Sequence, residues 1–152
     1  MTHDPFDLGL HDLNNAGVYA IGNDDVGPLS AAMRDAGLKV LRVDLDRCAD
    51  KRTLLARLAA QLDFPQGTGG NWDALSDNLR DLGWLKSPGG YALFLSDADG
   101  MRDAGTADFE TLLDVLDEAS QSWAQDDVPF WAFVALKDVP AYIAAQFGGA
   151  VI

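Results

Sequence analysis

Cysteine and histidine are nearly absent from this chain of 152 residues, which holds one cysteine, Cys48, and two histidines, His3 and His11. A single cysteine excludes an internal disulfide framework and suits a reducing compartment. The spacing of Cys and His that a zinc site needs is missing, and a Cys–His or Ser–His catalytic pair would require the N-terminal segment to fold over it. We therefore predict a protein that is not an enzyme and has no metal or cofactor.

Long hydrophobic runs are also missing, because none approaches the roughly 20 residues of a membrane-spanning helix. Residues 1–15 contain three aspartates and neither Lys nor Arg, so they lack the basic and apolar regions of a secretory signal. With 48% hydrophobic residues, the composition is typical of a globular protein. We expect a cytoplasmic protein that binds no membrane, with an irregular arm over residues 1–16 and a single domain over residues 17–152.

Basic residues are scarce, since eleven of them oppose 24 acidic residues and leave a net charge of −13. Such a charge repels nucleic-acid phosphates and anionic lipids, and it speeds the encounter with a basic protein. Simple solubility, or a host whose proteome is acidic throughout, is the alternative explanation. The net charge therefore excludes nucleic acid as a partner without identifying another.

Hydrophobic periodicity predicts strands that alternate with helices. Short runs rich in Val, Leu and aromatic residues predict strands over residues 18–21, 38–45, 91–95 and 129–136. Apolar residues three and four apart, with capping signals, predict helices over residues 28–36, 50–62, 71–84, 106–123 and 140–147. Strands that are apolar on both faces and separated by helices form parallel sheets covered by helices. The sequence thus predicts one α/β domain with a parallel sheet of three to four strands.

An acidic helix follows a glycine-rich loop in the middle of the chain, and Asn71 is its predicted N-cap. Asp73, Asp77 and Asp81 follow at intervals of four residues, so their carboxylates form one stripe along the helix. Like charges at this spacing destabilise a helix by roughly 0.2–0.5 kcal/mol per pair, and Arg80 offsets part of that repulsion. The stripe is either a solvated helix face or a surface for a cationic partner.

Two other segments suggest small-molecule chemistry. The glycine-rich residues 67–70 precede a helix, as in phosphate-binding loops, but they follow a helix and the Walker lysine is missing. Asp97 and Asp99 follow a buried strand, as in Mg²⁺-dependent phosphatases of the haloacid-dehalogenase type, but only 53 residues come after Asp99. We interpret the first segment as a protein-contact loop and the second as a turn that closes the strand. A small phosphatase is kept as an alternative.

Residues 64–79 resemble the barstar family of ribonuclease inhibitors. That family carries a hydrophobic residue followed by Pro, a short loop with Gly, and then Asn-x-Asp-Ala-Leu-x-Asp. The matching residues here are Pro65, Gly69, Asn71, Asp73, Ala74, Leu75, Asp77 and Leu79. The order of the predicted elements also corresponds over residues 38–136. The resemblance implies a barstar-like fold to which residues 1–37 add a strand and a helix, an extra N-terminal βα unit.

The resemblance also implies inhibition by occlusion. In the family, the loop and the following helix enter the active-site groove of a small basic ribonuclease, where the carboxylate matching Asp77 takes the place of a substrate phosphate. Asp73 and Glu118 match two further acids of the interface. The other residues expected to contact the partner are Gly67, Thr68, Gly69, Gly70, Asn71, Trp72 and Ser76.

Two positions depart from the family pattern, which has aromatic residues where this chain has Gly67 and Ser76. Aromatic anchors commonly dominate interface energy. Either the partner has a different surface, with Trp72 or Thr68 compensating, or the domain binds a different basic toxin or protein without inhibiting a ribonuclease. We predict a monomeric inhibitor or immunity protein for a basic bacterial ribonuclease or a related toxin.

Overall fold

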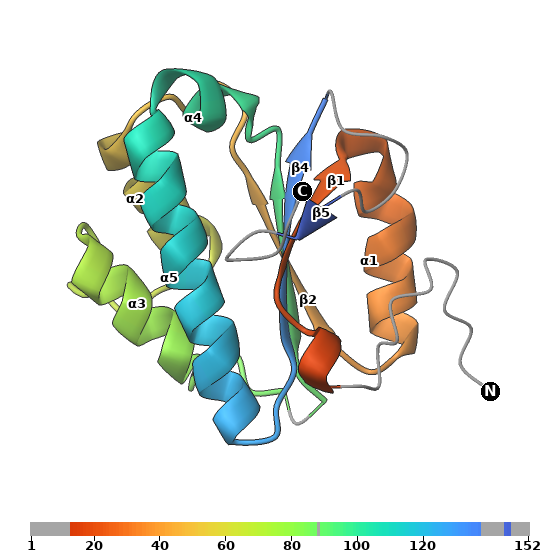
Figure 1. The fold of residues 1–152 in the computed structure, drawn as a ribbon. Helices are drawn as coiled ribbons and strands as arrows, with labels where there is room; N and C mark the ends of the chain where they lie inside the picture. Colours follow the sequence, from red (N-terminus) through yellow and green to blue (C-terminus); the bar gives the residue numbers. More distant parts are fainter. Residues whose placement is uncertain (1–12, 88, 138–144, 147–152) are drawn as a thin grey trace.

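Four parallel strands occupy the centre of the structure (Figure 1). The computed structural model describes residues 13–87, 89–137 and 145–146. The strands are β1 (Val18–Gly22), β2 (Lys39–Asp44), β3 (Tyr91–Ser96) and β4 (Phe130–Leu136). A short strand, β5 (Ala145–Gln146), pairs antiparallel with β1. The order β2-β3-β4-β1-β5 confirms the parallel sheet predicted from the sequence.

Helices cover both faces of this sheet (Figure 1). The helices α2 (Lys51–Gln61), α3 (Trp72–Asp81) and α5 (Thr106–Gln125) lie on one face, and α1 (Val26–Asp35) lies on the other. A short helix, α4 (Asp99–Ala104), leads from β3 into α5. Within the described ranges, none of the helices is long and apolar enough to cross a membrane.

Two hydrophobic clusters fill the space between the sheet and its helices. Along β3, Leu93 and Leu95 point into the cluster under α2, α3 and α5, whereas Ala92 and Phe94 point into the cluster under α1. Every residue of β4 is buried. Burial on both faces explains why these strands are continuous apolar runs and not alternating ones.

The N-terminal unit of β1 and α1 extends the sheet on the side away from β2. β1 pairs with β4 from Val18 opposite Ala132 to Gly22 opposite Leu136. The chain then passes through α1 to the far side of the sheet, where β2 begins. The three adjacent strands β2, β3 and β4 therefore all come from the part of the chain after the N-terminal unit.

Element boundaries differ from the sequence prediction by one to three residues, and three of these differences have a clear structural reason. α1 begins at Val26, two residues early, because the 3-10 turn Asn23–Asp25 leads directly into it and Val26 is buried. α3 ends at Asp81 and not at residue 84, because Leu82 takes a left-handed backbone conformation (φ 48°) while its side chain is buried. The predicted turn after β3 contains the start of α4.

Two predicted terminal segments lie mostly outside the described residues. Of the helix predicted over residues 140–147, the structure describes only Ala145–Gln146, and these form β5, so the helix prediction is wrong for them. Of the irregular arm predicted over residues 1–16, the first twelve residues are outside the described part. Leu13–Asn15 form one 3-10 turn.

Candidate partner-binding site

The loop between α2 and α3 depends on its glycines for its path. Gly67 (φ 81°) and Gly70 (φ 101°) adopt backbone conformations that L side chains rarely reach. Gly69 lies against α2, where an added Cβ would come within 3.0 Å of the Cβ of Ala59. The loop therefore presents main chain at these three positions.

Asn78, which the sequence analysis did not select, connects this loop to α3. The side chain is buried, and its Nδ2 donates to the main-chain oxygen of Thr68 (2.9 Å) and to the Thr68 Oγ1 (3.1 Å). The amide and hydroxyl of Thr68 donate in turn to the carbonyl oxygen of Pro65. A loop held in this way loses little conformational freedom on binding. The sequence signal that could have identified Asn78 was its spacing of three residues from the core residue Leu75.

The first turn of α3 carries the first of the predicted interface acids. The Asn71 Oδ1 accepts a hydrogen bond from the amide of Ala74 at 2.7 Å, which confirms the predicted N-cap. Asp73 is exposed in this turn, where the helix dipole favours a carboxylate. Trp72 is half-buried against the core, and the Nζ of Lys51 lies 5.8 Å from the centroid of its ring. Much of Trp72 is thus used by the fold itself.

Asp77 lies one turn further along α3, and 76% of its side chain is exposed. The Arg80 Nη2 donates to the Asp77 Oδ1 at 2.8 Å, and the Arg80 Nε donates to the main-chain oxygen of Ser76 at 3.3 Å. The side chain of Ser76 is half-buried. Of the three aspartates in the acidic stripe, Asp77 is therefore the one whose charge Arg80 offsets.

Glu118 lies on α5, the helix beside α3 (Figure 1). The indole Nε1 of Trp123 on α5 donates to the main-chain oxygen of Leu79 on α3 at 2.7 Å, which joins the two helices. Glu118 is exposed. The three predicted interface acids thus lie on two helices that pack against each other.

The surroundings of Glu118 are themselves acidic. Burial raises the pKa of the neighbouring Asp117, a hydrogen bond from Gln121 lowers it, and the charges of Asp114 and Glu118 raise it again. A cationic group placed beside α5 would relieve this repulsion. α5 therefore adds negative charge beside the acidic face of α3.

Aromatic residues brace the ends of the loop and of α3. The indole Nε1 of Trp84 donates to the main-chain oxygen of Leu62 at 2.9 Å, just before the loop. The ring of Trp84 also meets Phe64 edge-on, with centroids 5.9 Å apart. These contacts fix both ends of the segment that carries the candidate site.

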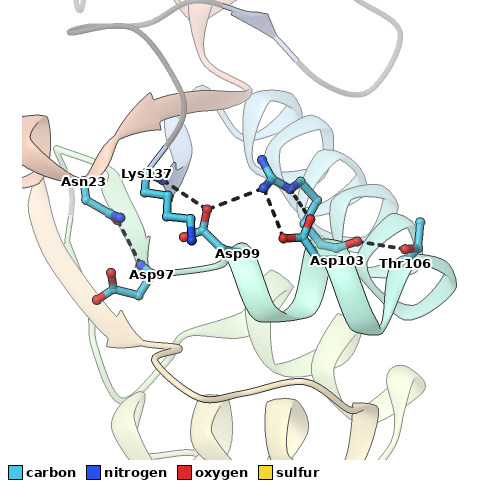
Figure 2. A network of polar contacts seen from close by, with 7 residues as sticks. Asn23, Asp97, Asp99, Asp103, Thr106 and Lys137 are labelled. Carbon is cyan, nitrogen blue, oxygen red and sulfur yellow. Dashed lines mark hydrogen bonds and ion pairs between the residues drawn. The ribbon is translucent and has the colours of Figure 1, made fainter.

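Asp97 and Asp99, the residues of the phosphatase alternative, lie after β3 and connect it to the ends of β1 and β4 (Figure 2). The amide of Asp97 donates to the Asn23 Oδ1 (3.0 Å), just after β1, and the Asp99 Oδ1 accepts from the amide of Lys137 (3.1 Å), just after β4. Arg102 also pairs with Asp99, at 3.6 Å. These contacts join the carboxyl ends of three strands.

Burial raises the pKa of Asp97, and the nearby carboxylates of Asp44, Asp46 and Asp99 raise it further. A cavity of about 340 Å³ beside it is lined by Arg42, Val43, Asp44, Gln61, Ser96 and Asp97. Among the residues that the structure describes, no group of three or more His, Cys, Asp or Glu side chains is arranged to hold a metal ion. Asp99 thus has a structural role. The interpretation as a strand-closing turn holds for Asp97 and Ala98, whereas Asp99 is already the first residue of α4.

A protein-family model matches the larger part of this chain. The family model described as Barstar (barnase inhibitor) matches residues 38–135. This range is well over half of the chain and runs from β2 to β4, so it includes the loop, α3 and α5 but not β1 or α1. A search of curated proteins finds no match.

Proposed function

Because this chain belongs to the barstar family of barnase inhibitors, we propose that it inhibits a small, basic, bacterial ribonuclease of the barnase type by occluding its active site. The observation that carries the proposal is the exposed acidic face of α3. Asp73 and Asp77 are presented there next to a glycine loop that Asn78 holds in place. A fixed carboxylate satisfies the Arg and Lys donors that would otherwise bind a substrate phosphate.

The proposed contacts divide between charge and main chain. Asp77 is the main electrostatic anchor. Asp73, one turn away on α3, and Glu118, on α5, add further negative charge to the contact surface. The loop contributes main-chain contacts through Gly67, Thr68, Gly69, Gly70 and Asn71. Trp72 and Ser76 complete the contact surface.

The overall charge supports an enzyme and not its RNA substrate as the target. At −13, the field repels RNA phosphates and accelerates the approach of a basic protein. We place this inhibitor in the cytoplasm as a monomer, where it would serve as an immunity protein against the ribonuclease. Residues 17–152 form the single binding domain in this proposal.

A second candidate function is the binding of a different basic toxin or protein without ribonuclease inhibition. Gly67 offers no side chain, and Ser76 offers only a small one that is half-buried. The aromatic anchors of the family therefore have no replacement at these two positions, which favours a partner with a different surface.

The experiment that tests the proposal is calorimetric titration of this protein into barnase, with RNA cleavage followed in parallel. We expect one-to-one binding that abolishes cleavage. Asp77→Asn should lower the affinity by at least about tenfold and flatten its dependence on salt, because it removes the central charge of the interface. The matched control Asp35→Asn removes an exposed carboxylate on α1 and should change the affinity little.

Each other outcome has a definite meaning. Binding that leaves cleavage intact would favour the second function. Equal effects of Asp77→Asn and Asp35→Asn would remove Asp77 from the interface and leave only net charge to explain binding. No binding to barnase or to a barnase-type ribonuclease of the host would overturn the inhibitor proposal.

A further inference from the structure

Arg80 is the only basic residue of α3, and it reaches back over the candidate site. Its Nη2 lies 2.8 Å from the Asp77 Oδ1, and its Nε donates to the Ser76 main-chain oxygen. Both contacts point toward the start of the helix, which is the direction in which helical side chains tilt. One side chain thus covers two adjacent residues of the proposed interface.

Of the two aspartates near it in sequence, Asp77 and Asp81, Arg80 pairs with Asp77. Asp81 is adjacent to Arg80 in sequence and equally acidic, but its carboxylate lies beside Gly83, where an added Cβ would meet the Asp81 Oδ1 at 3.1 Å. The contacts of the described residues give Arg80 two anchors, Ser76 and Asp77, both in the proposed contact surface. Arg80 therefore forms its ion pair with Asp77, the acid proposed as the main anchor of the interface.

We propose that Arg80 controls access to Asp77: in the free protein it neutralises the Asp77 carboxylate, and a basic partner must displace it in order to bind. This inference rests on the proposed function, because it assumes that Asp77 meets a cation of the partner. The ion pair is easily opened, since 46% of the Arg80 side chain and 76% of the Asp77 side chain are exposed, and exposed pairs contribute little stability.

A displaced Arg80 has a second effect on the complex. Its guanidinium stays on α3, next to the basic groups that Asp77 attracts, and like charges placed together at an interface are unfavourable. The partner that fits this chain therefore carries a carboxylate beside its cation, to receive Arg80. A ribonuclease whose cleft offers only cations is disfavoured by the same residue.

The test compares Arg80→Gln with the wild-type chain for binding to barnase at physiological salt. Losing the internal competitor should raise the affinity about 1.5- to fivefold, the range expected for an exposed ion pair. In an Asp77→Asn background the gain should be clearly smaller, because no carboxylate is left to release and only the repulsion between Arg80 and the partner's cations is relieved. Arg34→Gln, on α1, alters the net charge equally and is the matched control.

A second measurement does not depend on a partner. In NMR spectra of the full chain, the Arg80 Nη–H groups should exchange with water more slowly in the wild type than in Asp77→Asn, because Nη2 donates to the Asp77 Oδ1. Equal exchange rates would overturn the inference. So would an affinity gain that is equally large in Asp77→Asn or that Arg34→Gln reproduces. If neither the wild type nor Arg80→Gln binds a ribonuclease, both the proposed function and this inference are wrong. If the wild type binds and Arg80→Gln gives no gain in affinity, only the inference is wrong.

Discussion

At the residue scale, Asp25 is buried at the start of α1 with only 9% of its surface exposed, and none of the residues that the structure describes hydrogen-bonds to its Oδ2. Burial raises the pKa of this carboxyl, a hydrogen bond with the Gly22 main chain lowers it, and the charge of Asp24 raises it again. A carboxyl whose pKa is raised on folding destabilises the native state once the pH exceeds that folded pKa. The penalty is absent at a pH below the pKa of the unfolded chain.

Asp25→Asn is therefore expected to raise the free energy of unfolding by about 1 kcal/mol at pH 7, because it removes a buried charge and keeps the shape. The gain should shrink at pH 4, where the wild-type carboxyl takes up its proton. Urea unfolding at both pH values measures this, with Asp35→Asn, an exposed carboxylate at the other end of α1, as the control. A variant that is less stable at pH 7, or a gain that is independent of pH, contradicts the argument.

At the element scale, the loop after α2 and the helix α3 behave as one unit. The loop is held to the helix through the buried amide of Asn78 and to α2 through the close approach of Gly69 to Ala59. The proposed contact residues on the loop and on the helix therefore keep a fixed relation to one another. Such preorganisation lowers the entropy lost on binding.

Asn78→Ala tests this unit. The substitution leaves the Thr68 oxygens without their donor and should lower the free energy of unfolding by about 1–3 kcal/mol. Amide hydrogen exchange should become faster in the loop than in the strands, and affinity for barnase should fall although no charge is lost. Gln66→Ala, at an exposed position of the same loop, is the control. Unchanged exchange in the loop would show that the glycines alone hold it.

At the scale of the whole molecule, β1 and α1 cover one face of the sheet. Residues 38–135, the segment that the family model matches, would leave this face exposed on their own. Tyr19 of β1 stacks on Trp131 and Phe133 of β4, with ring centroids 5.5 and 5.9 Å away. Leu29 and Met33 of α1 belong to the same hydrophobic cluster as these two β4 residues. The N-terminal unit thus pairs with one edge of β4 and buries one face of the sheet.

A fragment that begins at residue 38 is expected to lose several kcal/mol of stability, more than the roughly 2–5 kcal/mol that Ile21→Ala should cost within the intact chain. Its exposed aromatic face and open β4 edge should cause association. Urea unfolding, dye binding and light scattering measure these effects. A monomeric fragment with the stability of the full chain would show that the unit serves a purpose other than cover.

Local patterns in the sequence predicted most of the elements. The caps are examples: Asp50 accepts a hydrogen bond from the amide of Thr53 at 2.8 Å, and Asn71 does so from Ala74. Each cap involves residues within one helical turn, and the buried strands are recognised from their own composition. Such features need no knowledge of distant residues. The short helix α4 was missed because six residues give too little periodicity to distinguish a helix from a turn.

The candidate site was predictable only in part. The acids on α3 and the glycine loop were evident from spacing and from the family resemblance. Asn78 was not, because its partner Thr68 lies across a loop and the sequence does not show that an amide at this position turns inward. Arg80 lay within reach of two aspartates, and only the folded geometry shows that it holds Asp77 and the Ser76 oxygen.

The sequence by itself determined that this protein is a helix-covered parallel sheet with an acidic helix behind a glycine loop, because periodicity, capping and charge spacing act over a few residues. Only the tertiary structure decided that β1 lies beside β4, that Leu82 turns inward to end α3, and that Asp77 is paired. These outcomes depend on which distant surfaces bury one another, and that competition is resolved only when the whole core packs.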